Sequence, residues 1–156
     1  MKEIPLTQNR TALVDEGDFE SLSKYTWRFS AGYAVRSVKI PKTHKNRTIY
    51  MHRQVLKVVN GEICDHKNGN GLDNRKENLR RCTVAENCRN RNISTRNKSG
   101  HKGVSWQKRE RRWYAQICVN GRTKTLGYFK DKSLAAQSYN EAAVKYFGEF
   151  ACVNNI

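Results

Sequence analysis

The middle of the chain, residues 61–92, is dense in Asn, Asp, Gly and Arg and poor in the side chains that build a hydrophobic core. Such a stretch needs a loop-rich structure or an organising metal ion, because it has little apolar surface to bury. Only 37% of the 156 residues are hydrophobic, so any core must be small. The sequence therefore predicts an α+β protein built from two small units.

The segment before this stretch indicates short strands and turns. Apolar residues bracket a polar turn in residues 4–15, which favours a hairpin. Residues 18–27 suit a short amphipathic helix, and residues 32–40 alternate as a half-buried strand before a basic loop. In the apolar stretch that follows, His52 could contact DNA, although a histidine there more often satisfies a backbone partner.

The segment after the stretch predicts a three-stranded antiparallel sheet with one helix packed behind it. Residues 103–107, 113–119 and 125–129 suit strands, and Asn120-Gly121 is a strong hairpin-turn signal. Residues 131–148 suit a helix, whose apolar stripe we expect to hold Leu134, Ala135, Tyr139, Ala142, Ala143 and Tyr146. We therefore expect one unit over 1–92, a linker over 93–100 and a second unit over 101–156.

The charge of the chain indicates nucleic acid as its partner. Lys and Arg total 30 against 14 Asp and Glu, giving a net charge of +16 and a pI near 10.0. Phosphate contacts release condensed counterions and so support binding by such a surface. No apolar run approaches the length of a membrane span and the N-terminus lacks a secretion signal, so we expect a cytoplasmic monomer with no evident protein partner. The five cysteines show no CxxC pairing, which predicts free thiols and no structural zinc.

The Asp65-His66 pair is the sharpest chemical signal. Hydrolysis of a phosphodiester needs a base for the water proton and positive charge near the phosphate. Histidine suits the base, and the neighbouring carboxylate can hold a hard divalent ion. Asn87 would lie on a helix that begins near Thr83, with Glu86 completing a capping box, and its amide oxygen can face Asp65 to complete the metal site.

Further residues around this pair are candidates for weaker roles. Asp73 is a rival metal ligand to Asp65, and Asn68, Asn70 and Asn74 suit turns of the loop. Arginine meets phosphate with a fork of donors. The candidates for clamping the scissile phosphate are Arg75, Arg80, Arg81 and Arg89.

Residues 65–91, DHKNGNGLDNRKENLRRCTVAENCRNR, resemble the HNH endonucleases, specifically the phage-type and intron-encoded homing branch. The resemblance implies a ββα-metal fold, with two strands, a loop and a helix around one divalent ion. It implies that His66 is the general base, that Asp65 and Asn87 are metal ligands, and that Asn78 ties the loop together and orients the histidine. The third motif position is Asn87 in place of His, which suits Mg²⁺ or Mn²⁺. The resemblance also implies products with 5′-phosphate and 3′-hydroxyl ends.

Residues 101–154 resemble the AP2 DNA-binding domain, through KGVSW (102–106), WYAQI (113–117), LGYF (126–129), the helix at 135–148 and Asn154. The resemblance implies that the sheet enters the major groove of DNA. Gln can read adenine and Thr can meet a thymine methyl group. The positions that match outward or basic contacts are Lys102, Ser105, Gln107, Arg109, Tyr114, Gln116, Arg122, Thr123 and Thr125.

Together these features favour a metal-dependent, homing-type endonuclease of phage or mobile-element origin, which selects sites in duplex DNA and nicks them. The alternative is a non-catalytic, sequence-specific DNA-binding regulator. An RNA-associated basic protein is disfavoured, because the chain lacks RNP-like and KH-like motifs.

Overall fold

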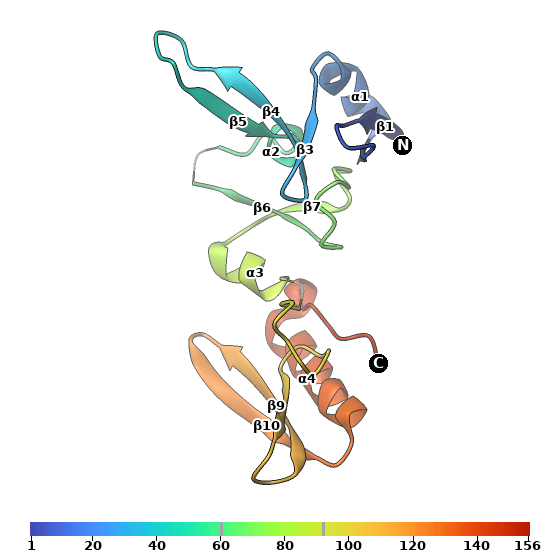
Figure 1. Cartoon of the computed structure of the whole chain (residues 1–156), viewed down its shortest axis with the longest axis vertical. Coiled ribbons are helices and arrows are strands. Elements are labelled where there is room, and N and C mark those ends of the chain that lie inside the picture. The colour runs from blue at the N-terminus through green and yellow to red at the C-terminus, as the bar shows by residue number, and fades with distance from the viewer. Residues whose placement is uncertain (60, 92) are drawn as a thin grey trace. The chain divides into compact units, whose positions relative to one another are not determined.

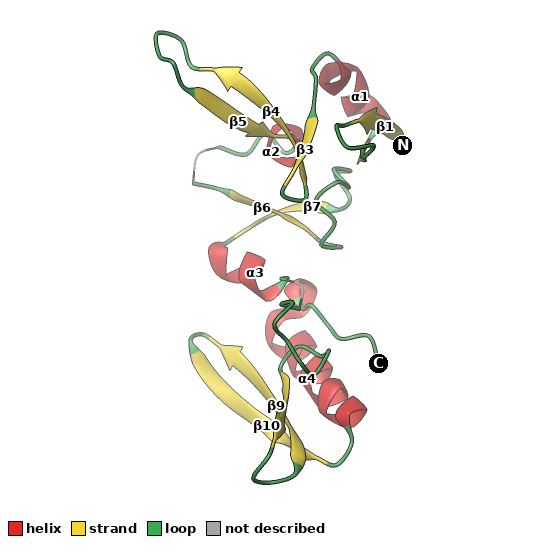
Figure 2. Cartoon of the chain, in the orientation of Figure 1, coloured by secondary structure: helices red, strands yellow, loops and turns green. Residues whose placement is uncertain are grey.

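The computed structural model describes residues 1–59, 61–91 and 93–156 (Figure 1). It divides into two compact units, Met1–Asn87 and Cys88–Ile156. Each unit combines small antiparallel sheets with helices (Figure 2), in accord with the α+β class. The unit boundary expected at residue 92 lies outside the described residues. Residues 93–100, the expected linker, fall within the second unit, where Asn97 and Ser99 hydrogen-bond the carbonyl of His101.

The first unit contains three small sheets, ordered β1-β2, β3-β4-β5 and β6-β7. Three short helices follow strands in this part of the chain, and the last of them, α3, ends two residues beyond the unit boundary. The elements are β1 (Lys2–Pro5), β2 (Thr11–Val14), α1 (Glu16–Ser23), β3 (Arg28–Ser30), β4 (Tyr33–Lys39), β5 (Asn46–Tyr50), α2 (Met51–Val55), β6 (Ile63–His66), β7 (Leu79–Cys82) and α3 (Val84–Arg89).

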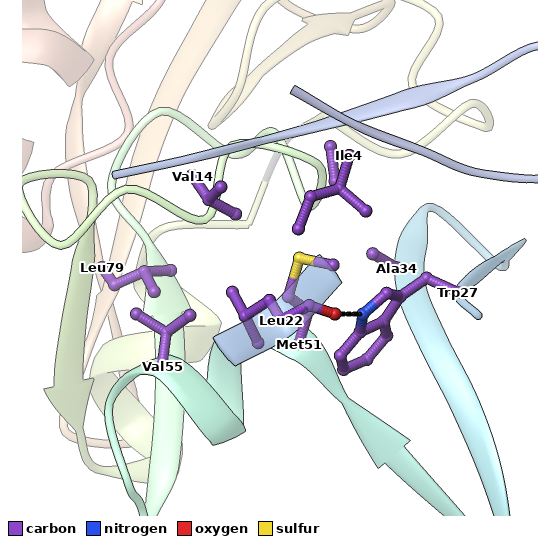
Figure 3. Packing of buried hydrophobic residues seen from close by; sticks show 9 residues of the cluster. Ile4, Val14, Leu22, Trp27, Ala34, Met51, Val55 and Leu79 are labelled. Carbon is purple, nitrogen blue, oxygen red and sulfur yellow. Dashed lines mark hydrogen bonds between the residues drawn. The ribbon is translucent and has the colours of Figure 1, made fainter. Parts of the chain in front are cut away.

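The predicted N-terminal hairpin is confirmed by the β1-β2 pairing, in which Ile4 lies opposite Ala12. Its turn places Gln8 and Asn9 at positive φ, a conformation that asparagine tolerates better than most residues. The hairpin covers a core that includes Leu22, Trp27 and Met51 (Figure 3). Trp27 Nε1–H donates to the Leu22 carbonyl at 2.9 Å, which supplies the partner that a buried indole needs.

The second unit is a three-stranded sheet of order β10-β9-β8 with a long helix against it, as expected. Asn120 and Gly121, at φ 51° and 77°, form the tight turn between β9 and β10. Asp131 accepts hydrogen bonds from the backbone of Ser133 and Leu134 and so caps the helix. The elements are β8 (Val104–Gln107), β9 (Arg112–Val119), β10 (Arg122–Phe129), α4 (Lys132–Phe147) and the 3-10 turn η1 (Gly148–Phe150).

The buried face of α4 differs from the expected stripe at its two ends. Leu134 and Tyr146 are exposed, whereas Ala136 and Phe147 are buried. Successive helical residues are about 100° apart, so a face centred on Ala135, Tyr139 and Ala143 leaves Leu134 and Tyr146 outside the contact with the sheet. Ala115 and Ile117 of β9 pack against this face.

Two further sequence expectations concern chemistry and membranes. All five cysteines, which lie in the described part of the chain, are free thiols, as expected. Within residues 1–59, 61–91 and 93–156, no helix is long and apolar enough to cross a membrane.

Candidate active site

The antiparallel pair β6-β7 positions the Asp65-His66 signal. Asp65 lies opposite Arg80, and His66 lies opposite Leu79, a member of the hydrophobic core. Directly opposed residues share a face of the ribbon, so the side chains of Asp65 and Arg80 meet on one face. His66 follows Asp65 in the strand and therefore points to the other face, where Leu79 joins the core. Asp65 and His66 are only 6% and 5% exposed, which makes them buried groups that need defined partners.

Asp65 is held by an ion pair with Arg80. The Nε and Nη2 groups of Arg80 donate to Asp65 Oδ2 at 3.0 and 2.8 Å. Both side chains are less than a tenth exposed. Arg80, expected to clamp the scissile phosphate, is therefore engaged by the carboxylate of the candidate site, which fixes the orientation of Asp65.

His66 lies in a cluster of rings from three other elements. Its ring centroid is 5.0 Å from that of His52, in an edge-on arrangement, and 5.9 Å from that of Tyr33. Tyr33 and Tyr50 also pack against His52, at 5.3 and 5.4 Å. This cluster joins α2 and the ends of β4 and β5 to the last residue of β6, so residues far apart in sequence build the wall of the site.

Burial sets the protonation of both histidines. Burial lowers the pKa of His66, an effect opposed by the Asn74 amide and by the Asp65 and Asp73 carboxylates. Burial, with smaller contributions from His66 and Arg53, lowers the pKa of His52 to about 3. Both rings are consequently neutral at pH 7, and a neutral imidazole is the form that can accept a proton.

His52 does not have the backbone partner expected for it. Its Nδ1 is buried and has no hydrogen-bond partner among the described residues. The ring of His52 instead packs against the rings of Tyr33, Tyr50 and His66.

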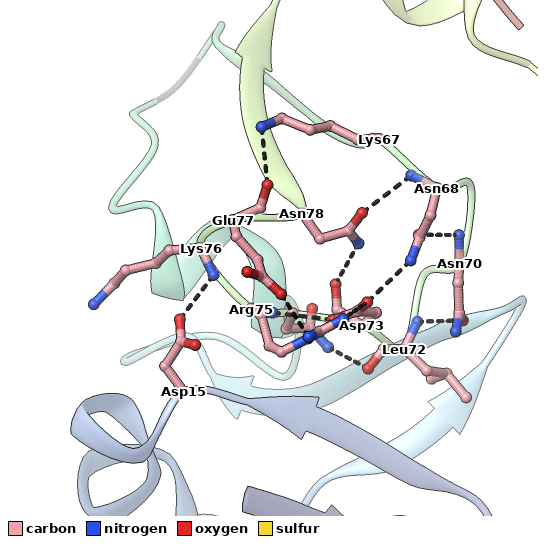
Figure 4. A network of polar contacts seen from close by, with 11 residues as sticks. Asp15, Lys67, Asn68, Asn70, Leu72, Asp73, Arg75, Lys76, Glu77 and Asn78 are labelled. Atoms are coloured by element: carbon pink, nitrogen blue, oxygen red, sulfur yellow. Dashed lines mark hydrogen bonds and ion pairs between the residues drawn. The ribbon is translucent and has the colours of Figure 1, made fainter. Parts of the chain in front are cut away.

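The loop between β6 and β7 is closed by its own polar side chains (Figure 4). Asn78 Oδ1 accepts from the Asn68 backbone at 3.0 Å, and Asn78 Nδ2 donates to the Asp73 carbonyl at 2.8 Å. Asp73 receives Arg75 Nε and Nη2 at 2.8 and 2.7 Å, and Asn68 Nδ2 at 2.9 Å. The side-chain hydrogen bond from Arg75 is the main reason why the pKa of Asp73 lies below its usual range. Asp73, the rival metal ligand, is thus a structural anchor of the loop.

The loop is also fastened to the N-terminal hairpin. The Leu13 backbone N–H donates to the Leu72 carbonyl, and Asn74 N–H donates to the Leu13 carbonyl, both at 2.8 Å. Lys76 N–H donates to Asp15 Oδ2 at 2.8 Å. These bonds explain why a loop with few apolar residues keeps a fixed position next to His66.

The remaining candidate phosphate clamps also have partners within the protein. Arg75 pairs with Asp73 and Glu77. Arg81 donates to Glu62 Oε1 and to the Leu56 carbonyl, both at 3.0 Å. Arg89 lies over the Phe147 ring, 5.0 Å from its centroid.

The predicted capping box at the start of α3 is confirmed. Glu86 N–H donates to Thr83 Oγ1 at 3.2 Å, and Thr83 N–H donates to Glu86 Oε2 at 2.8 Å. Asn87 lies in the first turn, where its N–H donates to the Thr83 carbonyl, and it is half-buried. The helix ends at Arg89.

The donors around the site suit a hard cation. The described residues contain no group of three His, Cys, Asp or Glu side chains placed to hold a metal ion. They do contain two buried groups that offer oxygen atoms, the Asp65 carboxylate and the Asn74 amide. Mg²⁺ and Mn²⁺ prefer oxygen ligands, and Mg²⁺ is often held by one or two carboxylates with water and phosphate completing its shell.

The outward sheet face of the second unit displays the other candidate residues. Ser105 lies opposite Tyr114, and Gln116 lies opposite Thr125. Tyr114 and Thr125 share a hydrogen bond of 2.8 Å between their hydroxyl oxygens. Five more of the candidates lie in this unit: Lys102 and Gln107 are half-buried, whereas Arg109, Arg122 and Thr123 are exposed.

Two residues of this unit lie differently from the sequence pattern. A bulge between Thr125 and Gly127 brings Tyr128 opposite Tyr114, with ring centroids 5.0 Å apart, and half of Tyr128 is exposed. Simple alternation along β10 could not reveal this shift. Lys102, which matches a DNA-contact position in the sequence, makes hydrogen bonds within the protein. Its ammonium group donates to the carbonyls of Arg89 and Arg91 at 2.6 and 2.7 Å.

Comparisons with known proteins give the family. Neither a protein-family profile nor a solved structure matches the chain. Over 146 residues the chain is 34% identical to the uncharacterized HNH endonuclease L560 of Acanthamoeba polyphaga mimivirus, covering 93% of this chain and 75% of that protein. Over 76 residues it is 36% identical to protein 3.8 of Escherichia phage T7, covering 46% of this chain and 63% of that protein. Because the match to the mimivirus protein covers most of both chains, the chain belongs to the HNH endonuclease family.

Proposed function

We propose that the protein is a metal-dependent, homing-type endonuclease that hydrolyses phosphodiester bonds in duplex DNA, with His66 as general base. The observation that carries the proposal is a buried, neutral His66 that directly follows the buried Asp65 in β6 of an HNH family member. A neutral imidazole is the form of histidine that can take a proton from water as a general base.

Each neighbouring residue has a defined part in this reaction. His66 takes the proton of the attacking water, and burial keeps the imidazole ready to accept it. Asn78 holds the backbone of the loop that leaves His66, through its bonds to Asn68 and Asp73. Arg80 holds the Asp65 carboxylate in one orientation. Asp65 and Asn87 would hold a divalent cation, Mg²⁺ or Mn²⁺, which supplies positive charge to the phosphate and the leaving oxygen when bound.

The second unit supplies the sequence registration in this proposal, as an AP2-like module. Its outward face combines Gln116 and Thr125, which can contact base edges, with exposed Arg109 and Arg122, which can contact phosphates. Phosphate contacts near a catalytic centre carry little sequence information, so a separate reading face gives site selection. One HNH centre in a monomer would cut one strand per binding event, which makes nicking the expected outcome.

Relaxation of supercoiled plasmid tests the proposal. Wild type and His66→Ala are compared in Mg²⁺ and in Mn²⁺, each with and without EDTA, and retention of the same DNA is measured alongside. We expect nicking that needs the metal and falls at least about a hundredfold in His66→Ala while retention persists. The exposed His44 serves as the matched control, and His44→Ala should nick like wild type. Retention without nicking, on plasmid and on a broad pool of genomic DNA, would leave the non-catalytic DNA-binding regulator as the function.

A further inference from the structure

The ring nearest His66 belongs to a second buried histidine, His52, which the proposed reaction does not use. His52 is 8% exposed and comes from α2, fourteen residues before His66 in the sequence. The edge-on contact of 5.0 Å between the two ring centroids is the closest ring contact of the cluster. The position of His52 therefore bears directly on the position of the base.

The cluster gives the His66 ring two walls. A histidine side chain has a broad torsional range about its ring bond, so neighbours decide where its nitrogen atoms lie. His52 forms one wall and Tyr33 forms the other, and these two rings also contact each other at 5.3 Å. A base that must meet a water molecule within hydrogen-bond reach benefits from such restriction.

The loop residue Gly71 fixes the second wall. A Cβ atom at Gly71 would lie 2.7 and 2.9 Å from Cδ1 and Cε1 of Tyr33, closer than carbon atoms can approach. The loop backbone therefore packs directly on the Tyr33 ring, and the loop and the ring cluster hold each other in place. His52 comes from α2, a helix anchored by the core contacts of Met51 and Val55.

The buried Nδ1 atom of His52 does not explain why a histidine stands at this position. Its Nδ1 is buried and lacks a hydrogen-bond partner among the described residues. A buried polar atom without a partner reduces stability, so an apolar ring of similar size would fold at least as well. What the position does provide is an aromatic surface against His66.

We infer that His52 is a positioning residue, whose ring holds the His66 imidazole in the orientation needed for proton abstraction. The inference rests on the proposed function of His66 and deepens it. The ring of His52 acts through contact, so its shape matters and its nitrogen atoms do not.

Two substitutions separate shape from chemistry. His52→Phe keeps an aromatic ring and removes the nitrogen atoms, whereas His52→Ala removes the ring. We measure the single-turnover cleavage rate at saturating protein, and the affinity for the same DNA in EDTA. The expected result is a rate about tenfold or more lower in His52→Ala, a rate close to wild type in His52→Phe, and unchanged affinity in both. The thermal midpoint of His52→Phe should be no lower than that of wild type.

A double-mutant cycle then asks whether His52 acts through His66. In the His66→Ala background, His52→Ala should cause no further loss of the residual rate, because the ring it positions is gone. Two results would overturn the inference while wild type remains an active nuclease. One is a rate loss from His52→Ala that is as large in the His66→Ala background as in wild type. The other is a His52→Phe rate as low as that of His52→Ala. A wild-type protein that never cuts DNA would instead overturn the proposed function, and the positioning role with it.

Discussion

In the first unit, the loop between β6 and β7 closes its polar side chains on one another, whereas in the second unit the sheet presents its polar side chains outward. Asp73 binds Arg75 and Asn68 within the loop, and Asp65 binds Arg80 across β6-β7. By contrast, Gln116 and Thr123 are exposed on the sheet face, with the core of Ala115 and Ile117 behind them.

The difference shows two uses of polar residues in one basic chain. In the loop between β6 and β7 they do the work of apolar contacts, because they hold a segment with few apolar residues beside His66. In the second unit an apolar core already fixes the sheet, so its outward polar residues are not needed to hold the fold. Mutations in polar residues should accordingly damage folding in the first unit and recognition in the second.

The largest expected effect comes from breaking the buried ion pair. Arg80→Met leaves the Asp65 carboxylate buried without its guanidinium, and we expect the first unit to lose about 3 kcal/mol or more in free energy of unfolding. The matched control is Arg81→Met on the same strand, whose pair with Glu62 is partly exposed and should contribute less than about 1 kcal/mol. The free energy of unfolding of each unit is measured by urea unfolding, with amide hydrogen exchange as the readout. If both variants lost the same free energy of unfolding, the buried Arg80-Asp65 pair would contribute no more than the partly exposed Arg81-Glu62 pair, which would contradict the account.

Acid should weaken the first unit selectively. Because the folded pKa of His52, about 3, lies below the ordinary value of 6.5, the unfolded chain takes up a proton first as the pH falls. The stability contributed by the neutral ring is present above pH 6.5 and is lost as the pH falls toward 3, at up to about 1.4 kcal/mol per pH unit. His52→Phe should flatten this dependence between pH 6.5 and 4. An identical pH slope in wild type and His52→Phe would show that His52 is not buried as described.

A smaller effect is expected from filling the space between the loop and the ring cluster. Gly71→Ala forces the Tyr33 ring or the loop to move, and we expect it to cost about 1–3 kcal/mol and to slow cleavage. Gly17→Ala is the control, because a Cβ atom there meets nothing within 4 Å and the residue lies in α1. It should be neutral or stabilising, since alanine favours helices. Thermal unfolding and single-turnover cleavage of both variants provide the comparison.

The smallest stability effects are expected from replacing two buried asparagines, one in each unit. Asn78 bridges Asn68 and Asp73 in the first unit, and Asn154 bridges the N–H and carbonyl of Lys102 in the second. Substitution by alanine should cost each unit about 1–2 kcal/mol, because buried backbone groups lose their partners. Only Asn78→Ala should also slow cleavage at saturating protein. A comparable rate loss in Asn154→Ala would mean that the two units are not separate in function.

Local sequence signals predicted many elements of the fold. Asn120-Gly121 determines a tight hairpin by its own backbone preference, and Thr83 and Glu86 form a capping box within a single helical turn. Asp65 and His66 are neighbours in sequence, so their proximity at the site needed no tertiary information. These features depend on contacts between residues at most three positions apart.

Contacts between distant segments could not be predicted in the same way. The pairing of Arg80 with Asp65 depends on the register of β6 and β7, which a shift of one residue would abolish. His52 meets His66 only because α2 packs beside β6, and nothing in the stretch around His52 marks it as part of a site. The bulge in β10 likewise reverses the orientation of Tyr128 from the one that alternation favours.

The proposed separation of DNA cleavage from DNA recognition can be measured directly with three proteins on one DNA. Wild type, His66→Ala and the double variant Gln116→Ala/Thr125→Ala are compared for affinity in EDTA and for cleavage rate in Mg²⁺ at saturating protein. We expect His66→Ala to bind like wild type and to lose cleavage, and the double variant to bind more weakly but to cut at the wild-type rate once saturated. Loss of both properties together in either protein would contradict the separation of the catalytic site from the reading face.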